Sequence, residues 1–227
     1  ENGIIDLGFW PGGDRDGNPF VTTKITLNVA ERLRQTILRS YYRDIRRLKR
    51  RFTFDGVQNI LSKVEKRLYK HVVRSYAKVN FSQKILLEEL YAAREIIVNK
   101  HQSLFVEELN DVINKVRIFG FHFATLDIRQ DSRVHHKAFT QIVEDLHKIG
   151  DTTFPKNYLT LSEKEQIDIL SVVKGEIDTN ILTDETSVKT IESIYALKEI
   201  QHRNGERGAN RYIISNNQTA LNVMETF

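Results

Sequence analysis

The stretch Phe121-His122-Phe123-Ala124-Thr125-Leu126-Asp127-Ile128-Arg129 has the side-chain alternation of a β-strand. Successive side chains of a strand point to opposite faces, so Thr125, Asp127 and Arg129 share one face and the apolar residues between them share the other. The apolar face is expected to pack on helices. The charged face then points into the interior of a sheet or barrel, where Asp and Arg are costly to bury unless they pair or meet a ligand.

Two further segments, residues 4–10 and 211–215, have strand character, and helical periodicity dominates the sequence between the three. Helices are expected over residues 22–48, 55–72, 82–97, 105–120, 132–146, 162–175 and 184–204. Ser82 is expected to start the third of these helices, Ser132 to cap the fifth, and a capping box over residues 162–165 to begin the sixth. Strands separated by long helical stretches cannot pair as hairpins, and they fit the parallel strands of an α/β architecture. The predicted fold is therefore mostly α-helical with a few parallel strands.

Composition excludes several classes of protein. The chain has 227 residues, of which 40% are hydrophobic and only three are proline, so a real core is expected and a disordered or collagen-like chain is not. The absence of cysteine excludes a disulfide scaffold, a thiolate zinc site and a cysteine nucleophile. No apolar run reaches the roughly 20 residues of a membrane span. Because residues 1–3 show neither an initiator methionine nor a signal-peptide pattern, the chain is expected to be a piece of a longer protein.

Positive charge is concentrated in one part of the chain. Between Lys24 and Lys78 there are 16 basic and 4 acidic residues, a local net charge of +12, whereas the whole chain carries +4. The densest run, residues 43–51, would suit a nucleic-acid or phosphate-binding face. No aromatic residues interleave this run and no helix-turn-helix pattern accompanies it. It therefore more readily indicates a solvated helix face, or one that docks on an acidic neighbour within the parent protein.

A glycine-rich, charged turn follows the first predicted strand, where residues 9–19 read Phe-Trp-Pro-Gly-Gly-Asp-Arg-Asp-Gly-Asn-Pro. Gly12 and Gly13 allow a tight turn and a close approach of the backbone to a ligand. The D-x-D-x-N spacing of residues 14–18 matches the start of a calcium loop, but Pro and Ile stand where that loop requires Gly and Glu. Two interpretations stay open: a ligand-binding loop, or a capped turn in which the Asp and Arg side chains satisfy one another and the nearby backbone.

Arg129 is the strongest candidate for a functional residue. It lies at the carboxyl end of a predicted strand, where α/β folds place their active sites, and a guanidinium suits two-point capture of phosphate or carboxylate. The alternative is a structural Asp127–Arg129 pair or a structural network of ion pairs. Adjacent helical side chains diverge, so His135 and His136 do not readily chelate one metal. His136 is expected to be buried and His135 exposed, and no metal ligands are assigned.

Three segments of the chain, taken together, resemble the phosphoenolpyruvate carboxylase family. Residues 10–22 are similar to the signature W-x-G-G-D-R-D-G-N-P-x-V-T, residues 126–135 to L-D-I-R-Q-E-S-x-x-H, and residues 208–215 to a later A-x-Y-V-I-S strand. The segments occur in the family's order, so the resemblance covers nearly the whole chain.

The resemblance implies a cytoplasmic, usually homotetrameric lyase of carbon dioxide fixation that serves the tricarboxylic acid cycle. Such an enzyme converts phosphoenolpyruvate and bicarbonate to oxaloacetate and phosphate with Mg²⁺ or Mn²⁺, and its fold is a TIM-like β/α barrel with extra helices. The phosphoryl group passes to bicarbonate, and the enolate that remains then captures CO₂. The resemblance implies no nucleic-acid partner and no membrane partner.

The resemblance also implies roles for particular residues. Trp10, Gly12 and Gly13 would border the pocket for bicarbonate and CO₂. Arg129 would be the catalytic residue that binds the anionic substrate or intermediate. Supporting roles, which hold the loop and the strand in shape, would fall to Asp14, Arg15, Asp16, Asn18 and Asp127.

Departures from the family lie mainly in what the chain lacks. The family's catalytic histidine belongs to an upstream T-A-H-P-T motif, and its acidic metal ligands and G-R-G-G loop lie downstream. Within the shared motifs, Asp131 replaces the usual Glu and Pro11 stands where Met is common. Residues 1–227 are thus expected to be a single central fragment with part of the barrel, unable to turn over alone. The alternatives are a basic helical nucleic-acid-binding module and a purely structural module.

Overall fold

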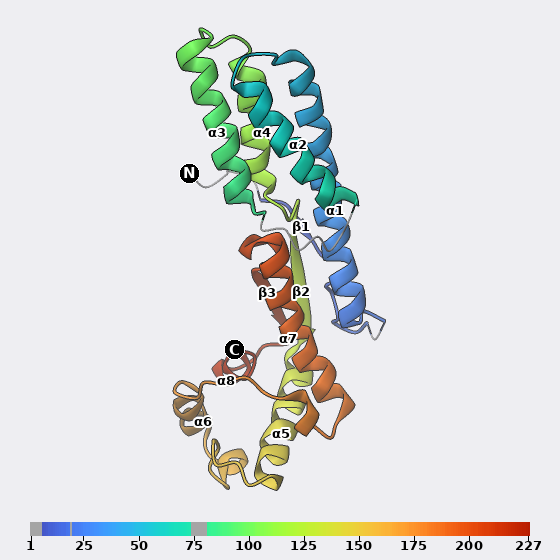
Figure 1. Ribbon diagram of the computed structural model, residues 1–227. Coiled ribbons are helices and arrows are strands. Elements are labelled where there is room, and N and C mark those ends of the chain that lie inside the picture. The colour runs from blue at the N-terminus through green and yellow to red at the C-terminus, as the bar shows by residue number, and fades with distance from the viewer. Residues whose placement is uncertain (1–5, 19, 74–80) are drawn as a thin grey trace. The chain divides into compact units, whose positions relative to one another are not determined.

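The computed structural model describes residues 6–18, 20–73 and 81–227 (Figure 1). These residues form two compact units, which are described separately below. The first unit contains residues 6–9, 28–126 and 200–210. The second unit contains residues 10–27, 127–199 and 211–227.

Helices make up most of the chain. The α-helices are α1 (Thr23–Arg51), α2 (Val57–Val73), α3 (Gln83–Lys100), α4 (Val106–Phe119), α5 (Ser132–Lys148), α6 (Glu163–Leu170), α7 (Glu185–Asn204) and α8 (Ala220–Met224). The strands are β1 (Gly8–Phe9), β2 (Thr125–Asp131) and β3 (Arg211–Ser215), and short 3₁₀ helices are η1 (Tyr158–Thr160), η2 (Thr179–Ile181) and η3 (Glu206–Gly208). The prediction of a mostly helical chain with a few strands is confirmed.

All strand pairing among the described residues is parallel, as predicted. β2 pairs with β1 through Gly8 and Thr125 in the first unit, and with β3 through Asp127 and Arg211 in the second. The described strands do not close into a barrel. β3 has the predicted bounds, whereas the strand expected over residues 4–10 is observed only at Gly8–Phe9, and its first two residues lie outside the described part of the chain.

The central strand begins later than predicted, at Thr125 instead of Phe121. The preceding residues still complete the end of α4, because the N–H of Phe123 donates to the carbonyl of Phe119 at 2.8 Å. Phe123 also has a positive φ of 66°, which is incompatible with an extended strand. The alternation of apolar residues over 121–124 was therefore wrongly interpreted as strand.

Helices α1 to α4 run side by side in the first unit (Figure 1) and enclose its core. Each helix contributes a stripe of buried side chains at three- and four-residue spacing, which confirms the predicted periodicity. The stripe of α1 includes Ile37, Tyr41, Ile45 and Leu48. The buried hydroxyl of Tyr41 donates to the carbonyl of Gly120 at 2.7 Å and so ties α1 to the end of α4.

Polar side chains fix where several helices begin. Ser82 caps α3 and Ser162 forms a complete capping box on α6, both as predicted. Thr22 accepts a hydrogen bond from the N–H of Ile25 at the start of α1. The cap of α5 is Asp131 and not the predicted Ser132, which is already the first helical residue.

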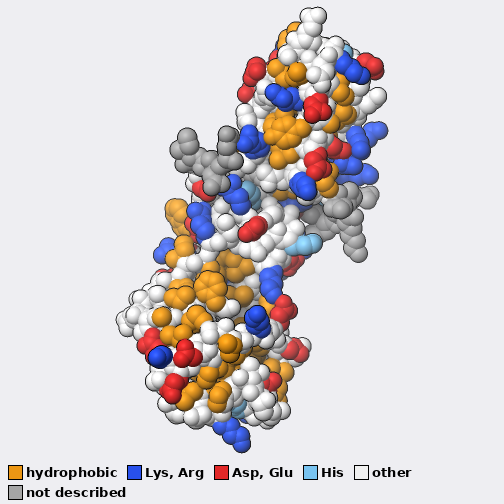
Figure 2. All heavy atoms as spheres, turned by 90° about the vertical axis from the view of Figure 1, so that its left-hand side faces the viewer, with side chains coloured by type: hydrophobic (Ala, Val, Ile, Leu, Met, Phe, Trp, Pro, Cys, Tyr) orange, Lys and Arg blue, Asp and Glu red, His pale blue; other side chains and the backbone are white. Residues whose placement is uncertain are grey.

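A second apolar cluster lies in the second unit, where Val143 of α5 packs with Phe154 and Tyr158. Helix α8 packs against α5 and α6. Apolar side chains also gather on the outer face of this unit (Figure 2). The large exposed apolar residues of the unit are Trp10, Phe20, Ile25, Ile149, Leu159, Val172, Ile213 and Phe227.

A buried carboxylate joins α5 to the segment before α7. Asp145 is 1% exposed and accepts hydrogen bonds from Lys148 Nζ at 2.7 Å and from the backbone N–H of Thr183 at 2.8 Å. Burial alone would raise the pKa of Asp145, but the hydrogen bonds from Lys148, Thr183 and Gln141 outweigh it and lower the pKa to about 2. The ionised form is therefore the one that stabilises this unit.

Replacing this carboxylate tests its contribution. We expect Asp145→Asn to lower the free energy of unfolding at pH 7 by about 2 kcal/mol, because charge-assisted hydrogen bonds are lost in a buried position. The native pKa is depressed, so the wild-type advantage should be full above about pH 4 and vanish as the pH falls towards 2. Urea unfolding measured across this range checks both points. The exposed neighbour Glu144, changed to Gln, is the matched control and should leave stability unchanged at pH 7.

Candidate functional site

The glycine turn lies directly against β2. The N–H of Gly13 donates to the carbonyl of Trp10 at 2.9 Å, which closes the turn. Gly12 has a φ of 83°, a left-handed conformation that glycine adopts at no steric cost. A Cβ atom at Gly13 would lie 2.2 Å from the carbonyl oxygen of Asp127. Glycine is thus required at position 13 because the turn approaches β2 of the protein itself, and not because it approaches a ligand.

Backbone hydrogen bonds extend this contact along β2. The N–H of Arg129 donates to the carbonyl of Gly13 at 3.0 Å, and the N–H of Arg15 donates to the carbonyl of Arg129 at 2.9 Å. Asp14 forms a parallel bridge with Arg129. The turn therefore acts as a further short parallel strand beside the carboxyl end of β2.

Two ion pairs occupy the charged face of the strand. Arg129 Nη1 lies 3.3 Å from Asp14 Oδ2, and Arg211 Nε lies 2.8 Å from Asp127 Oδ1. Asp127 and Arg129 do not pair with each other, and each belongs instead to a set of ion pairs of the kind that the network alternative describes. Asp14 and Arg129 are brought together from 115 residues apart in the sequence.

Arg129 keeps part of its hydrogen-bonding capacity free. Its side chain is 39% exposed, and its buried Nε has no hydrogen-bond partner among residues 6–18, 20–73 and 81–227. Trp10, the other predicted ligand-binding side chain of this region, is 61% exposed. This face can hold an anion through a guanidinium at the end of a parallel strand.

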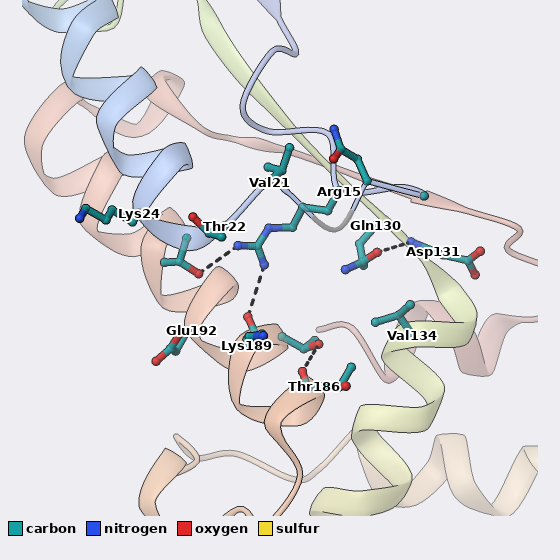
Figure 3. Close-up of a pocket in the computed structure, with 14 residues that line it drawn as sticks. Arg15, Val21, Thr22, Lys24, Gln130, Asp131, Val134, Thr186, Lys189 and Glu192 are labelled. Atoms are coloured by element: carbon teal, nitrogen blue, oxygen red, sulfur yellow. Dashed lines mark hydrogen bonds between the residues drawn. The ribbon is translucent and has the colours of Figure 1, made fainter.

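A cavity of about 710 Å³ lies elsewhere in the second unit (Figure 3). Arg15 and Asn18 of the turn line it, but Trp10 and Arg129 do not. Its remaining lining residues come from the start of α1, the end of β2, α5 and α7, and are Gly17, Val21, Thr22, Thr23, Lys24, Gln130, Asp131, Val134, Thr186, Lys189, Thr190 and Glu192. The contribution of α7 was missed because no local sequence pattern links it to the turn.

Arg15 points into this cavity (Figure 3). Its guanidinium donates to Thr23 Oγ1 at 2.9 Å and to the carbonyl of Lys189 at 3.3 Å. Burial lowers the pKa of Arg15, partly opposed by Tyr212 and Glu192. The interpretation in which the Asp and Arg side chains of the turn satisfy one another is therefore wrong for Arg15.

The remaining acidic and amide residues of the turn have local roles. Asp14 accepts from the N–H of Asp16 at 3.1 Å, and Asn18 accepts from the N–H of Phe20 at 3.1 Å. Asp16 is half-buried on the same turn. These contacts shape the loop.

Asp131, the shorter carboxylate noted above, is 7% exposed at the junction of β2 and α5. Hydrogen bonds from the side chain and backbone of Arg133, together with one from Asn216 at 2.8 Å, hold the pKa of Asp131 well below its usual range. The residue thus fixes the start of α5 and the segment after β3.

The two neighbouring histidines have the opposite burial to the one predicted. His135 is 3% exposed, and its Nε2 lies 2.8 Å from the hydroxyl of Tyr212. Burial lowers the pKa of His135 to about 4, with partial opposition from Asp131, so the ring is neutral at pH 7. The side chain of His136 is 58% exposed and contacts Glu225 at 2.8 Å.

Metal ligands do not come together in the part of the chain that the structure describes. Among the residues that the structure describes, no three His, Asp or Glu side chains are close enough to hold a metal ion. The described helices also include none that is both long and apolar enough to cross a membrane.

Most of the basic run of α1 is engaged in ion pairs within the first unit. Arg46 and Lys49 share Glu65, Arg47 pairs with Asp44, and Arg51 pairs with Glu108. Such pairs are typical of a solvated helix face.

The comparisons of this chain with known proteins agree on one family. The family model described as phosphoenolpyruvate carboxylase matches residues 1–84 and 57–227. The chain is 26% identical over 265 residues to the phosphoenolpyruvate carboxylase of Nitrosomonas eutropha, and 25% identical to those of Thermosynechococcus vestitus and Ralstonia nicotianae. These alignments cover 98%, 96% and 98% of this chain but only 28%, 26% and 26% of the relatives.

The contact between Gly13 and β2 can be tested by adding one methyl group. We expect Gly13→Ala to cost about 2 kcal/mol of unfolding free energy, because the backbone must move to relieve the overlap with Asp127. Gly17→Ala is the matched comparison, since it has open space but a φ of 65°. It should cost only about 1 kcal/mol. Equal losses in urea unfolding would show that the turn does not depend on this close approach.

Proposed function

This chain belongs to the phosphoenolpyruvate carboxylase family, and we propose that it is a central segment of a complete carboxylase. That enzyme would make oxaloacetate and phosphate from phosphoenolpyruvate and bicarbonate. Family membership carries the proposal, and the chain spans 28% of the length of the first relative that it matches. We further propose that the complete enzyme is cytoplasmic and homotetrameric.

The position and exposure of Arg129 are the structural observations that best support an anion-binding role for this segment. Its guanidinium lies at the carboxyl end of β2 and is partly exposed, and its ion-pair partner among the described residues is Asp14, at 3.3 Å. A weak ion pair of this kind positions the side chain while leaving N–H groups for a second anion. Phosphoenolpyruvate offers both a phosphate and a carboxylate.

The proposed reaction assigns a part to each side chain of this face. An oxygen of bicarbonate attacks phosphorus and the bond from phosphorus to the enol oxygen breaks, giving carboxyphosphate and the enolate of pyruvate. Carboxyphosphate then separates into CO₂ and phosphate, and the enolate carbon bonds to CO₂. Arg129 would bind phosphoryl or carboxylate oxygens during these steps. Trp10 would offer an apolar wall to CO₂ beside the Gly12–Gly13 turn.

The divalent cation of this family has no ligand set in the described residues. The acidic side chains of the charged face, Asp14 and Asp127, are each already paired with an arginine. We therefore propose that Mg²⁺ or Mn²⁺ is held by parts of the complete enzyme outside this chain, and no step is assigned to the metal here.

A partial TIM-like barrel is the fold that we propose for the strands. β1 and β3 each pair only with β2 among the described residues, so one edge of each strand is open. The exposed Ile213 of β3 and the apolar face in Figure 2 are surfaces that further barrel elements would cover.

The first test concerns the chain by itself. We expect the 227-residue chain, supplied with phosphoenolpyruvate, bicarbonate and Mg²⁺, to form no oxaloacetate above a blank without protein. The reason is that its described residues hold no metal ligand set, and its sequence lacks the family's T-A-H-P-T histidine motif. Oxaloacetate can be followed by its reduction with NADH and malate dehydrogenase. Turnover above the blank would overturn the proposal that the segment is incomplete.

The second test concerns Arg129 in the complete protein that contains this segment. We expect Arg129→Ala to lower kcat/KM for phosphoenolpyruvate by about 100-fold or more, because a charge-assisted contact to the reacting anion is lost. Unfolding free energy should change by less than about 1 kcal/mol, as for other exposed ion pairs.

Arg43→Ala serves as the matched control for this test, since it removes the same charge from an exposed position on α1. It should leave kcat/KM unchanged. Unchanged kinetics in Arg129→Ala would refute the assignment of Arg129, and a loss of folding would favour a structural role.

A further inference from the structure

The cavity beside Arg15 has the chemistry of a second anion site. It belongs wholly to the second unit, and its volume of about 710 Å³ lies within the range of small-molecule sites. Gln130 of β2 lines it, whereas Arg129, the residue before it in the strand, does not. The function proposed above makes no use of it.

Arg15 gives the cavity a positive charge that Glu192 offsets only in part. The guanidinium is half-buried, and it forms no ion pair with a carboxylate in the part of the chain that the structure describes. Its two hydrogen bonds go to neutral oxygens, those of Thr23 and of the Lys189 backbone. Burying a cation without a counter-charge is unfavourable, and a bound anion would remove that cost.

Gln130 provides an independent donor in the same space. Its side chain is 9% exposed, and its Oε1 accepts from the N–H of Asp131 at 3.0 Å. This hydrogen bond fixes the orientation of the amide, since a backbone N–H requires an acceptor. The amide nitrogen makes no hydrogen bond to any described residue, and Figure 3 shows it directed into the space between Arg15 and Val134.

The acidic lining residues do not compete for this space. Figure 3 shows the side chains of Asp131 and Glu192 pointing away from the gap between Arg15 and Gln130. The carboxylate of Asp131 is already bound by Arg133 and Asn216. Val21 and Val134 supply apolar walls.

We propose that this cavity binds a small anionic metabolite, with a carboxylate or phosphate group held between the guanidinium of Arg15 and the amide nitrogen of Gln130. The guanidinium and the amide nitrogen can donate hydrogen bonds but cannot accept them. They therefore favour an anion over a cation, and over a neutral molecule with few hydrogen-bond acceptors. The apolar walls favour a compact carbon skeleton on the same ligand. Arg15 is thus a ligand-binding residue, beyond the supporting role that the family resemblance gives it.

Titration of the ¹⁵N-labelled chain with inorganic phosphate and with succinate, at constant ionic strength, tests the proposal. The side-chain NH₂ of Gln130 and the Nε–H of Arg15 are the NMR signals to follow, because they report this cavity and not the face of Arg129. We expect saturable shifts with at least one of the two anions. The anion that binds more tightly identifies the group that the site prefers.

Two variants and a control make the result specific. Arg15→Gln should weaken binding at least about tenfold, in keeping with the loss of a charge-assisted hydrogen bond. Gln130→Glu should do the same, and it retains both the size of the side chain and the acceptor for the N–H of Asp131. It therefore keeps the test valid should Arg15→Gln fail to fold. Arg43→Gln removes an equal charge from an exposed site and should not change the affinity.

Two results would overturn the proposal. One is the absence of saturable shifts with both anions. The other is an equal weakening by Arg43→Gln and Arg15→Gln, which would indicate non-specific attraction to a basic protein. Neither result depends on carboxylase activity, because the readout is binding.

Discussion

The carbonyl group of Asp127 lies so close to Gly13 that no side chain fits between them. This contact allows the turn after β1 to hydrogen-bond to Arg129 as a short parallel strand. Asp14 then reaches the guanidinium of Arg129, and Arg15 is directed to the other side of the turn, into the cavity. The positions of both arginines depend on the absence of one methyl group.

Charge is compensated differently at the three arginines of this region. Arg211 has Asp127 at 2.8 Å, Arg129 has Asp14 at 3.3 Å, and Arg15 has only neutral oxygens. Of the three, Arg15 is therefore the one that has no carboxylate within ion-pair distance among the described residues.

The sequence alone predicted those features that depend on residues close together along the chain. Helix stripes, the caps Ser82 and Ser162 and the strand β3 are local patterns, and they are confirmed. The burial of the two histidines was predicted wrongly, because His135 is buried through a contact with Tyr212, 77 residues away. No local pattern reports such a partner.

In the candidate site, too, local features could be predicted from the sequence and long-range contacts could not. The position of Arg129 at a strand end could be predicted from alternation, but its contact with Asp14 spans 115 residues. The hydrogen bond from Arg15 to the carbonyl of Lys189 spans 174 residues, and it involves a backbone atom whose position depends on the whole fold. Residue type gives no signal for a contact of that kind.

Three carboxylates in the first unit each contact two cations. Glu65 contacts Arg46 and Lys49, Asp44 contacts Arg47 and Lys115, and Glu89 contacts Lys63 and Arg67. Each of these three side chains therefore acts as a bridge that joins helices as well as a counter-ion. Neutralising any one of them would free two cations at once and remove an attraction between neighbouring helices.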